Sequence, residues 1–268
     1  MSVTPKKEPQ APVRPTAEAG EALAAQFSRN LLTYPEALQY VESRGIARTW
    51  AEAGEIGFCP PYAENIFPLL KGRIVVPIRD VHGSVIAFAG RQFEPMRQMT
   101  ERAIWEMFSA KPARAQETID KWNRGKWINE TFPKKMHLFG LHDAKNFARE
   151  RGYIVIVEGY LDRMVLASKT LGNTAAVCGT TLSNWHAALI KRYCDHVVLL
   201  LDGDTAGEKA LETILPRLEE SDLVPHIVFL PQGYDPDDFA LKFGGKQLRR
   251  VIEGMLERNE AEIRINIT

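Results

Sequence analysis

The sequence has few of the residues from which zinc proteins and secreted proteins are built. Its 268 residues include only three cysteines, Cys59, Cys178 and Cys194, which are widely spaced and form no CxxC pair. This spacing excludes a four-cysteine zinc site and fits a reducing compartment. The six histidines form no HExxH motif and no closely spaced group of metal ligands. We therefore expect a cytoplasmic protein that binds no zinc.

Long hydrophobic runs and an excess charge of one sign are also missing. No apolar stretch approaches the roughly 18 residues of a membrane-spanning helix, and residues 1–26 lack the apolar core of a secretory signal. Lys plus Arg and Asp plus Glu both number 34, so the net charge excludes no class of partner. Residues 1–33 combine Pro, Ala and charge, and we expect them to be disordered or loosely attached.

Residues 34–150 have the pattern of an α+β subdomain. Apolar residues at helical spacing predict a helix that starts near Tyr34 and stops at Gly45. Two apolar runs within residues 73–91 flank the turn at Asp80–Gly83, which predicts a β-hairpin. Residues 92–125 are mixed in charge with helical tendency around 101–110, a pattern that predicts neither a packed nor a mobile segment.

After Arg151 short apolar runs alternate with helical segments. The apolar runs cover 153–157, 174–178, 196–201 and 225–230, and the last helix is expected after residue 246, followed by a frayed end. Strands that alternate with helices of about a dozen residues imply βαβ units and a parallel sheet. Continuous apolar strands indicate that helices cover both faces of this sheet. The expected fold class is α/β, a parallel sheet flanked by helices and preceded by a mixed α+β subdomain.

Carboxylates follow three of these apolar runs. They are Glu158, Asp162, Asp202, Asp204, Asp235 and Asp237. Parallel strands share one polarity, so the acids should meet at one edge of the sheet, where ligands of such folds bind. Several carboxylates held close together repel one another unless a cation neutralises them. Mg²⁺ is suited to this role because it prefers oxygen ligands and also coordinates phosphate oxygens.

Each of these motifs has a simpler interpretation when it is taken alone. A single DxD is commonly a helix N-cap with an acidic first turn, and DPD alone is a turn followed by a cap. Their joint occurrence at successive strand ends favours a site for divalent cations. Two ions about 4 Å apart would suit phosphoryl transfer.

The ordered motifs EGYLD (158–162), GT (179–180), DGDTAG (202–207) and DPD (235–237) resemble the TOPRIM domain of primases, topoisomerases and some nucleases. Their form is most similar to the bacterial DnaG-type primases. The resemblance implies that the six acids bind two or more Mg²⁺ or Mn²⁺ ions, with Glu158, Asp202 and Asp204 in the catalytic role. It covers about residues 34–245.

Basic residues upstream of the acids would bind the nucleic acid. "GRIVVPIRDVHGSVIAFAGR" (72–91) and "KWINETFPKKMHLFGL" (126–141) are similar to the DnaG-type segments that precede TOPRIM, and the second interleaves basic and aromatic residues as single-strand grooves do. The candidates for binding template and nucleotide are Lys71, Arg73, Arg79, Arg91, Lys126, Asn129, Lys134 and Lys135.

The chain also departs from the DnaG-type pattern. Residues 1–33 contain neither Cys nor His, so we expect the zinc-binding module to be absent, and only a short helical segment, 244–268, follows the predicted TOPRIM domain at 151–243. The helicase-binding domain of the family is expected to be missing too. A compact phage or plasmid primase and a truncated primase both fit this organisation.

Three hypotheses follow for the function. The first is a DNA primase core, a nucleotidyltransferase that synthesises short RNA primers on single-stranded DNA from ribonucleoside triphosphates, with a replicative helicase as a candidate partner. The second is a metal-dependent TOPRIM nuclease. The third is a non-catalytic nucleic-acid-binding protein of the replisome. The basic residues favour the primase over the nuclease, and the complete acid set disfavours the non-catalytic protein.

Overall fold

The computed structural model describes residues 16–64, 66–202 and 205–265, which contain two β-sheets. The first is an antiparallel sheet with the order β1-β2-β3-β4. Its strands are β1 (Gly57–Cys59), β2 (Arg73–Arg79), β3 (Val85–Gln92) and β4 (Trp127–Asn129). Strands β2 and β3 form the predicted hairpin, whose turn is closed by the Asp80 carboxylate as it accepts hydrogen bonds from the amides of His82 and Ser84. The expected hairpin is therefore confirmed.

The second sheet has the order β10-β9-β8-β6-β7-β5, with every pair parallel except β5 with β7. Its strands are β5 (Leu138–Phe139), β6 (Tyr153–Val157), β7 (Thr174–Val177), β8 (His196–Leu201), β9 (Val224–Phe229) and β10 (Glu262–Arg264). The predicted α/β fold class is thus confirmed. One expectation was wrong: the end predicted to fray pairs with β9 as β10, because Glu262–Arg264 alternates polar and apolar residues like a strand.

Helices cover both faces of the six-stranded sheet, and alternate residues of β6 show this. Val155 and Val157 pack into one core with α7 (Tyr160–Ser168), α10 (Pro236–Phe239) and α11 (Gly245–Glu257). Ile154 and Ile156 pack into the other with α6 (Leu141–Arg151), α8 (Asn184–Lys191) and α9 (Thr205–Glu219). The first core continues into the four-stranded sheet, so the two sheets share buried apolar surface. Because β5 and α6 precede residue 151 but belong to this unit, we propose that the second domain begins near β5.

The four-stranded sheet is covered by α1 (Ala17–Thr33), α2 (Pro35–Ser43) and α3 (Arg48–Glu52). The helix α1 corrects the expectation of a loosely attached segment for this part of the chain. Its apolar residues Ala24, Phe27 and Leu31 recur at helical spacing and are buried, and Thr16 caps its first turn. Residues 1–15 lie outside the described residues.

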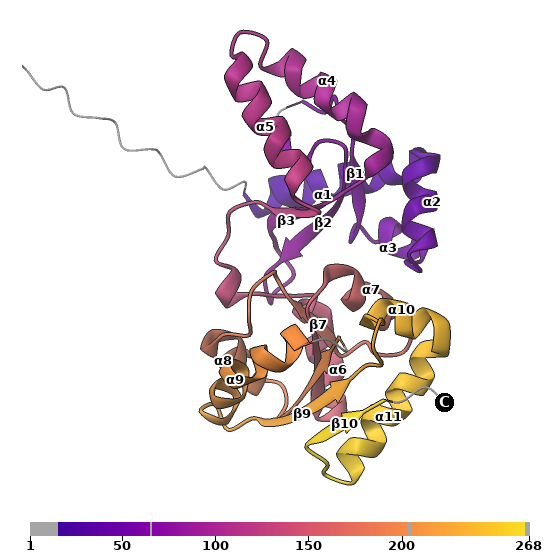
Figure 1. Cartoon of the computed structure of the whole chain (residues 1–268), viewed down its shortest axis with the longest axis vertical. Coiled ribbons are helices and arrows are strands. Elements are labelled where there is room, and N and C mark those ends of the chain that lie inside the picture. Colours follow the sequence, from indigo (N-terminus) through magenta and orange to yellow (C-terminus); the bar gives the residue numbers. More distant parts are fainter. Residues whose placement is uncertain (1–15, 65, 203–204, 266–268) are drawn as a thin grey trace, which may run out of the picture.

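The segment 92–125, for which the sequence favoured no arrangement, is an ordered helical hairpin. It consists of α4 (Arg97–Met107) and α5 (Pro112–Arg124), which project at the end of the molecule away from the six-stranded sheet (Figure 1). Ile104, Ile119 and Trp122 form a small core of their own between the two helices. Short 3₁₀ turns at Pro68–Leu70, Glu94–Met96 and Lys134–Met136, and a π-helical turn at Ala240–Gly244, complete the fold.

Arg163 of α7 links the two parts of the molecule. Its side chain is only 1% exposed, donates a hydrogen bond to the carbonyl of Gly140, pairs with Asp143 at 3.1 Å and lies over the Trp50 ring of α3. Gly140 precedes α6 with a positive φ of 77°, and an added Cβ there would overlap the Arg163 Nε atom. This close approach makes Gly140 obligatory for reasons beyond its backbone conformation.

Gly152, which follows α6, provides a matched control because its φ is also 77° while an added Cβ would meet no described atom within 4 Å. We predict that Gly152→Ala lowers the free energy of unfolding by about 1 kcal/mol through backbone strain alone. Gly140→Ala should cost a further ~1–3 kcal/mol, because the buried Arg163 must move. Urea denaturation of both variants measures the difference. Equal losses would contradict this role of Arg163.

Candidate metal and nucleic-acid site

Three of the predicted acids meet beyond the carboxyl end of the parallel sheet. Oxygens of Asp162, Asp235 and Asp237 all lie within 4.8 Å of one another. Asp162 lies in the first turn of α7 and accepts a hydrogen bond from the Asp237 amide at 3.2 Å. Asp235 caps α10 by accepting the amide of Asp238 at 2.9 Å. These acids therefore lie at the starts of α7 and α10, as helix-capping residues do, and the same helix starts hold them together as a cluster.

Glu158 and Asp202 line the same pocket as these three acids, and its volume is about 260 Å³. Glu158 follows β6 and Asp202 follows β8, which are neighbouring parallel strands, so the topology brings both to this edge. Asp204, the remaining predicted acid, lies outside the described residues. The sequence-based expectation that the strand ends converge thus agrees with the positions of five of the six acids.

Burial makes two of the three acids in the cluster unusually weak. Burial and the negative charge of Asp235 raise the pKa of Asp162 to about 6. Burial and the negative charges of Asp162 and Asp235 raise the pKa of Asp237 to about 8. Burial also disfavours the charged form of Asp235, but the hydrogen bond that it accepts from the Asp238 amide and the positive charge of Arg44 help to outweigh this, and its pKa is lowered. Without a cation, the cluster therefore binds a proton more readily near neutral pH than isolated aspartates do.

The donor set fits a divalent cation. The cluster offers only carboxylate oxygens, the ligands that Mg²⁺ and Mn²⁺ prefer. Asp237 is 1% exposed, and no hydrogen-bond donor in the described part of the chain reaches its buried Oδ1 atom. A buried carboxylate oxygen without a donor is costly, and a bound cation would satisfy it.

Two of the predicted basic residues line the acid pocket. Arg91, on β3, and Lys126, which precedes β4, both face it together with Trp127. The Arg91 guanidinium lies 5.7 Å from the centre of the Trp127 ring, and Trp127 in turn packs on Tyr160. Asn129 accepts a hydrogen bond from the Tyr160 hydroxyl at 2.6 Å. Asn129 therefore supports the wall of the pocket.

Lys134 and Lys135 lie in the 3₁₀ turn that precedes β5 and do not line the pocket. Their backbone carbonyls hold the start of α8 through Ser183 and His186, while the Lys135 side chain is exposed. Their role in binding nucleic acid stays a prediction.

Lys71, Arg73 and Arg79 correct the expected basic set because their side chains are buried. Arg79 pairs with Glu21 and Glu55 at 2.6 and 2.8 Å. Lys71 donates a hydrogen bond to the carbonyl of Ala63. Each of these cations is paired with a carboxylate or hydrogen-bonded inside the protein. In the folded protein they are therefore not available to bind a phosphate.

Arg73 is fully buried beneath the start of β4. Its guanidinium donates hydrogen bonds to the carbonyls of Trp122, Gly125 and Lys126, and it lies over the Trp122 ring. Burial lowers its pKa to about 10, which still leaves it charged at neutral pH. Arg73 therefore holds the backbone that presents Lys126, while its own charge is out of reach of a nucleic acid.

Sequence reasoning missed Arg44. It follows α2, belongs to the unit of the four-stranded sheet, and its Nη2 atom lies 2.8 Å from Oδ2 of Asp237. A basic residue just before the glycine that ends a helix is common for reasons of helix capping alone. No local signal in the sequence therefore distinguished it.

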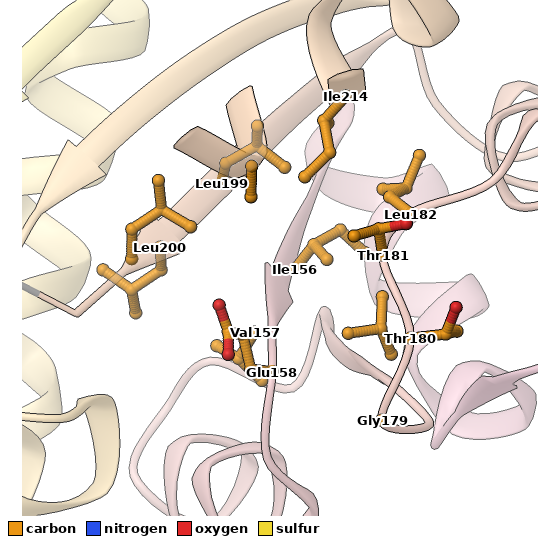
Figure 2. Close-up of a pocket in the computed structure, with 13 residues that line it drawn as sticks. Ile156, Val157, Glu158, Gly179, Thr180, Thr181, Leu182, Leu199, Leu200 and Ile214 are labelled. Atoms are coloured by element: carbon orange, nitrogen blue, oxygen red, sulfur yellow. The ribbon is translucent and has the colours of Figure 1, made fainter. Parts of the chain in front are cut away.

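A second, apolar cavity of about 380 Å³ lies on the other side of Glu158. Figure 2 shows the loop Gly179–Leu182 on one side of it, Leu199 and Leu200 of β8 on the other, and Ile156 and Val157 of β6 between them. Glu158 thus lines both hollows at the strand ends. The predicted Gly179-Thr180 motif forms the rim of this cavity and does not line the acid pocket.

Comparisons with known proteins agree with this arrangement. Residues 155–240 match the Toprim-like family. The α/β fold of this part of the chain is thus of the TOPRIM type. No helix among the described residues has both the length and the apolar character needed to cross a membrane.

Curated relatives of the chain are DNA primases. That of Aquifex aeolicus is 33% identical over 264 residues, which cover 89% of this chain and 49% of the relative, and that of Pseudomonas aeruginosa is 27% identical over 92% and 38%. The chain spans about half or less of the length of these relatives. The solved zinc-binding and RNA polymerase domains of the Aquifex aeolicus primase superimpose with a TM-score of 0.70 at 29% identity, over 89% of this chain and 62% of the other.

A solved DnaG primase catalytic domain bound to single-stranded DNA has a TM-score of 0.67 at 26% identity, over 89% of this chain and 80% of that one. Together these similarities confirm the predicted resemblance to the catalytic core of DnaG-type primases.

The raised pKa of Asp237 predicts a pH dependence of stability for the metal-free protein. A carboxyl whose pKa is higher in the folded than in the unfolded protein holds its proton when folded. It favours folding at low pH, and this contribution is lost as the pH rises toward about 8. We expect Asp237→Asn, which cannot ionise, to be more stable than the wild type at pH 8 by about 1–3 kcal/mol, with the difference shrinking toward pH 5.

Urea denaturation in the presence of a chelator at several pH values measures this difference. Excess Mg²⁺ should reverse its sign at pH 8, because only the wild type keeps the full ligand set. A difference that does not vary with pH would contradict the raised pKa.

Proposed function

We propose that this chain contains the RNA-polymerising core of a DNA primase, a metal-dependent nucleotidyltransferase that makes short RNA primers on single-stranded DNA. The observation that carries the proposal is the composition of one pocket. Glu158, Asp202 and the Asp162–Asp235–Asp237 cluster line it together with Arg91 and Lys126. A site that joins nucleotides needs both kinds of charge, one to hold cations and one to hold phosphates.

The proposed roles of the described residues follow from their positions, and that of Asp204 follows from the sequence motif that it shares with Asp202. Glu158, Asp202, Asp204 and the three-acid cluster would hold two or more Mg²⁺ or Mn²⁺ ions, which when bound neutralise charge on reacting phosphate oxygens. Arg91 and Lys126 bind phosphates of the template or the incoming ribonucleoside triphosphate, and the Trp127 face offers a stacking surface beside them. Catalysis in such a site consists mainly of positioning and electrostatic stabilisation.

The partners of this site are proposed on the same grounds. Single-stranded DNA, ribonucleoside triphosphates and the growing RNA primer all present phosphates to Arg91 and Lys126. A replicative helicase is a candidate protein partner by analogy with the DNA primases to which the chain is similar. Among the described residues, the group of side chains that could hold a metal ion consists of aspartates and includes neither the cysteines nor the histidines that zinc sites commonly use.

The activity is tested by incorporation of labelled ribonucleotides on single-stranded DNA with Mg²⁺ or Mn²⁺. Asp202→Ala should lower primer synthesis by roughly 100-fold or more, because it removes a ligand at the reacting edge. Asp195→Ala is the matched control, since Asp195 precedes the same strand β8 at the opposite edge and is exposed. It should retain full activity.

Full activity of Asp202→Ala and Asp204→Ala would refute the assignment. Cleavage of labelled DNA with metal and no nucleotides, without primer synthesis, would instead identify a nuclease.

The basic residues are tested by the salt dependence of binding to single-stranded DNA. Lys126→Ala should weaken binding and reduce the slope of log K against log salt by roughly 0.7, the value expected for one phosphate of a single strand that is no longer neutralised. Arg102→Ala removes the same charge from the exposed surface of α4, away from the pocket, and should leave the slope unchanged. Equal slopes for both variants and the wild type would show that Lys126 does not bind a phosphate of the single strand.

A further inference from the structure

Arg44 places a protein cation inside the proposed metal site. Its Nη2 atom lies 2.8 Å from Asp237 Oδ2, and its charge acts on Asp235 and Asp162 as well. Arg44 comes from the end of α2, in the unit of the four-stranded sheet, whereas the acids belong to the six-stranded sheet and its helices. One side chain thus connects the acid cluster to the other part of the molecule.

The backbone of Arg44 is held close to the cluster. Its amide is hydrogen-bonded within the last turn of α2, and the next residue, Gly45, has a φ of 74°. A Cβ added at Gly45 would overlap a methyl carbon of Leu241, so α2 ends in direct contact with the segment that follows α10. The packing of the end of α2 against Leu241 therefore places the Arg44 guanidinium near Asp237, in addition to the attraction between the two charges.

The two members of this ion pair differ in freedom. The Arg44 side chain is 30% exposed, so its guanidinium can reach solvent by rotation, while the Asp237 side chain is 2% exposed and fixed by the start of α10. The cation can leave and the anion cannot.

The ion pair is also incomplete. Strong arginine–carboxylate pairs use two parallel hydrogen bonds. Here one hydrogen bond joins them, and within the described residues both the Arg44 Nε and the Asp237 Oδ1 atoms are buried without a hydrogen-bond partner. The single Arg44 guanidinium also lies in the same pocket as three carboxylates, and its charge acts on all of them. Arg44 therefore neutralises the cluster only in part and leaves a carboxylate oxygen available.

We propose that Arg44 is the internal counter-ion of the acid cluster, and that it gives up Asp237 when a divalent cation binds to Asp162, Asp235 and Asp237. This inference rests on the metal-binding role in the proposed function. Its consequence is that Arg44 and the metal compete for one carboxylate. Loading of the site then breaks the ion pair between the end of α2 and α10, which connects metal occupancy to the docking of the two units.

Titration with Mn²⁺, followed by the EPR signal of the free ion, measures the affinity without DNA or nucleotides. Arg44→Gln should bind Mn²⁺ about tenfold more tightly than the wild type, equivalent to ~1.4 kcal/mol, because the competing cation is gone. Arg91→Gln removes the same charge from the same pocket but from a residue paired with Tyr40, so it should tighten binding less than about threefold through long-range electrostatics alone. Adding Asp237→Asn to Arg44→Gln should abolish the gain, which assigns it to this cluster.

Equal or weaker binding by Arg44→Gln, or an equal gain in Arg91→Gln, would overturn the proposal. A second measurement uses the wild-type protein alone, so it does not depend on the folding of a variant. The NMR signal of the Arg44 Nε–H group in the wild type should shift on saturation with Mg²⁺ as the guanidinium leaves Asp237, and an unchanged signal would also overturn it. Loss of primer synthesis with both results intact would refute only the proposed polymerase function.

Discussion

The repulsion between carboxylates at one edge of a sheet is the constraint on which the rest of this site depends. Parallel strands with buried apolar residues carry Glu158 and Asp202 to the same edge, and the capped start of α10 holds Asp235 and Asp237 against Asp162. The strands and helix starts that carry these groups fix the positions of their backbones. The carboxylates therefore need positive charge from other residues, and Arg44 and the basic residues of the same pocket provide it.

Much of this arrangement could be predicted from local patterns joined by one rule of topology. The apolar runs and the helices between them identify a parallel sheet, and the shared polarity of its strands then places Glu158, Asp202 and Asp235 together. Arg44 could not be found in this way, since it lies 193 residues from Asp237 in the sequence. The burial of Arg79 could not be predicted either, because its partners Glu21, on α1, and Glu55, between α3 and β1, are brought near it only by the tertiary fold.

Burial of a predicted binding residue does not remove it from the function. Three of the four carbonyls to which Arg73 donates lie where α5 ends and β4 begins, and the Lys126 side chain from this same stretch lines the acid pocket. The helical hairpin of α4 and α5 is anchored through the same region, because the Trp122 indole donates to the carbonyl of Lys71. One buried cation thus sets both the position of the hairpin and the direction of the neighbouring surface charge.

The strand β10, which forms where the sequence pattern predicts a frayed end, changes how the six-stranded sheet meets other molecules. The two edges of this sheet are β10, with three residues, and β5, with two. Long exposed edge strands offer free amides and carbonyls to a second chain and invite aggregation, whereas very short ones give little for another strand to pair with. A parallel sheet with long apolar inner strands is protected here by edges too short to act as a template for intermolecular pairing.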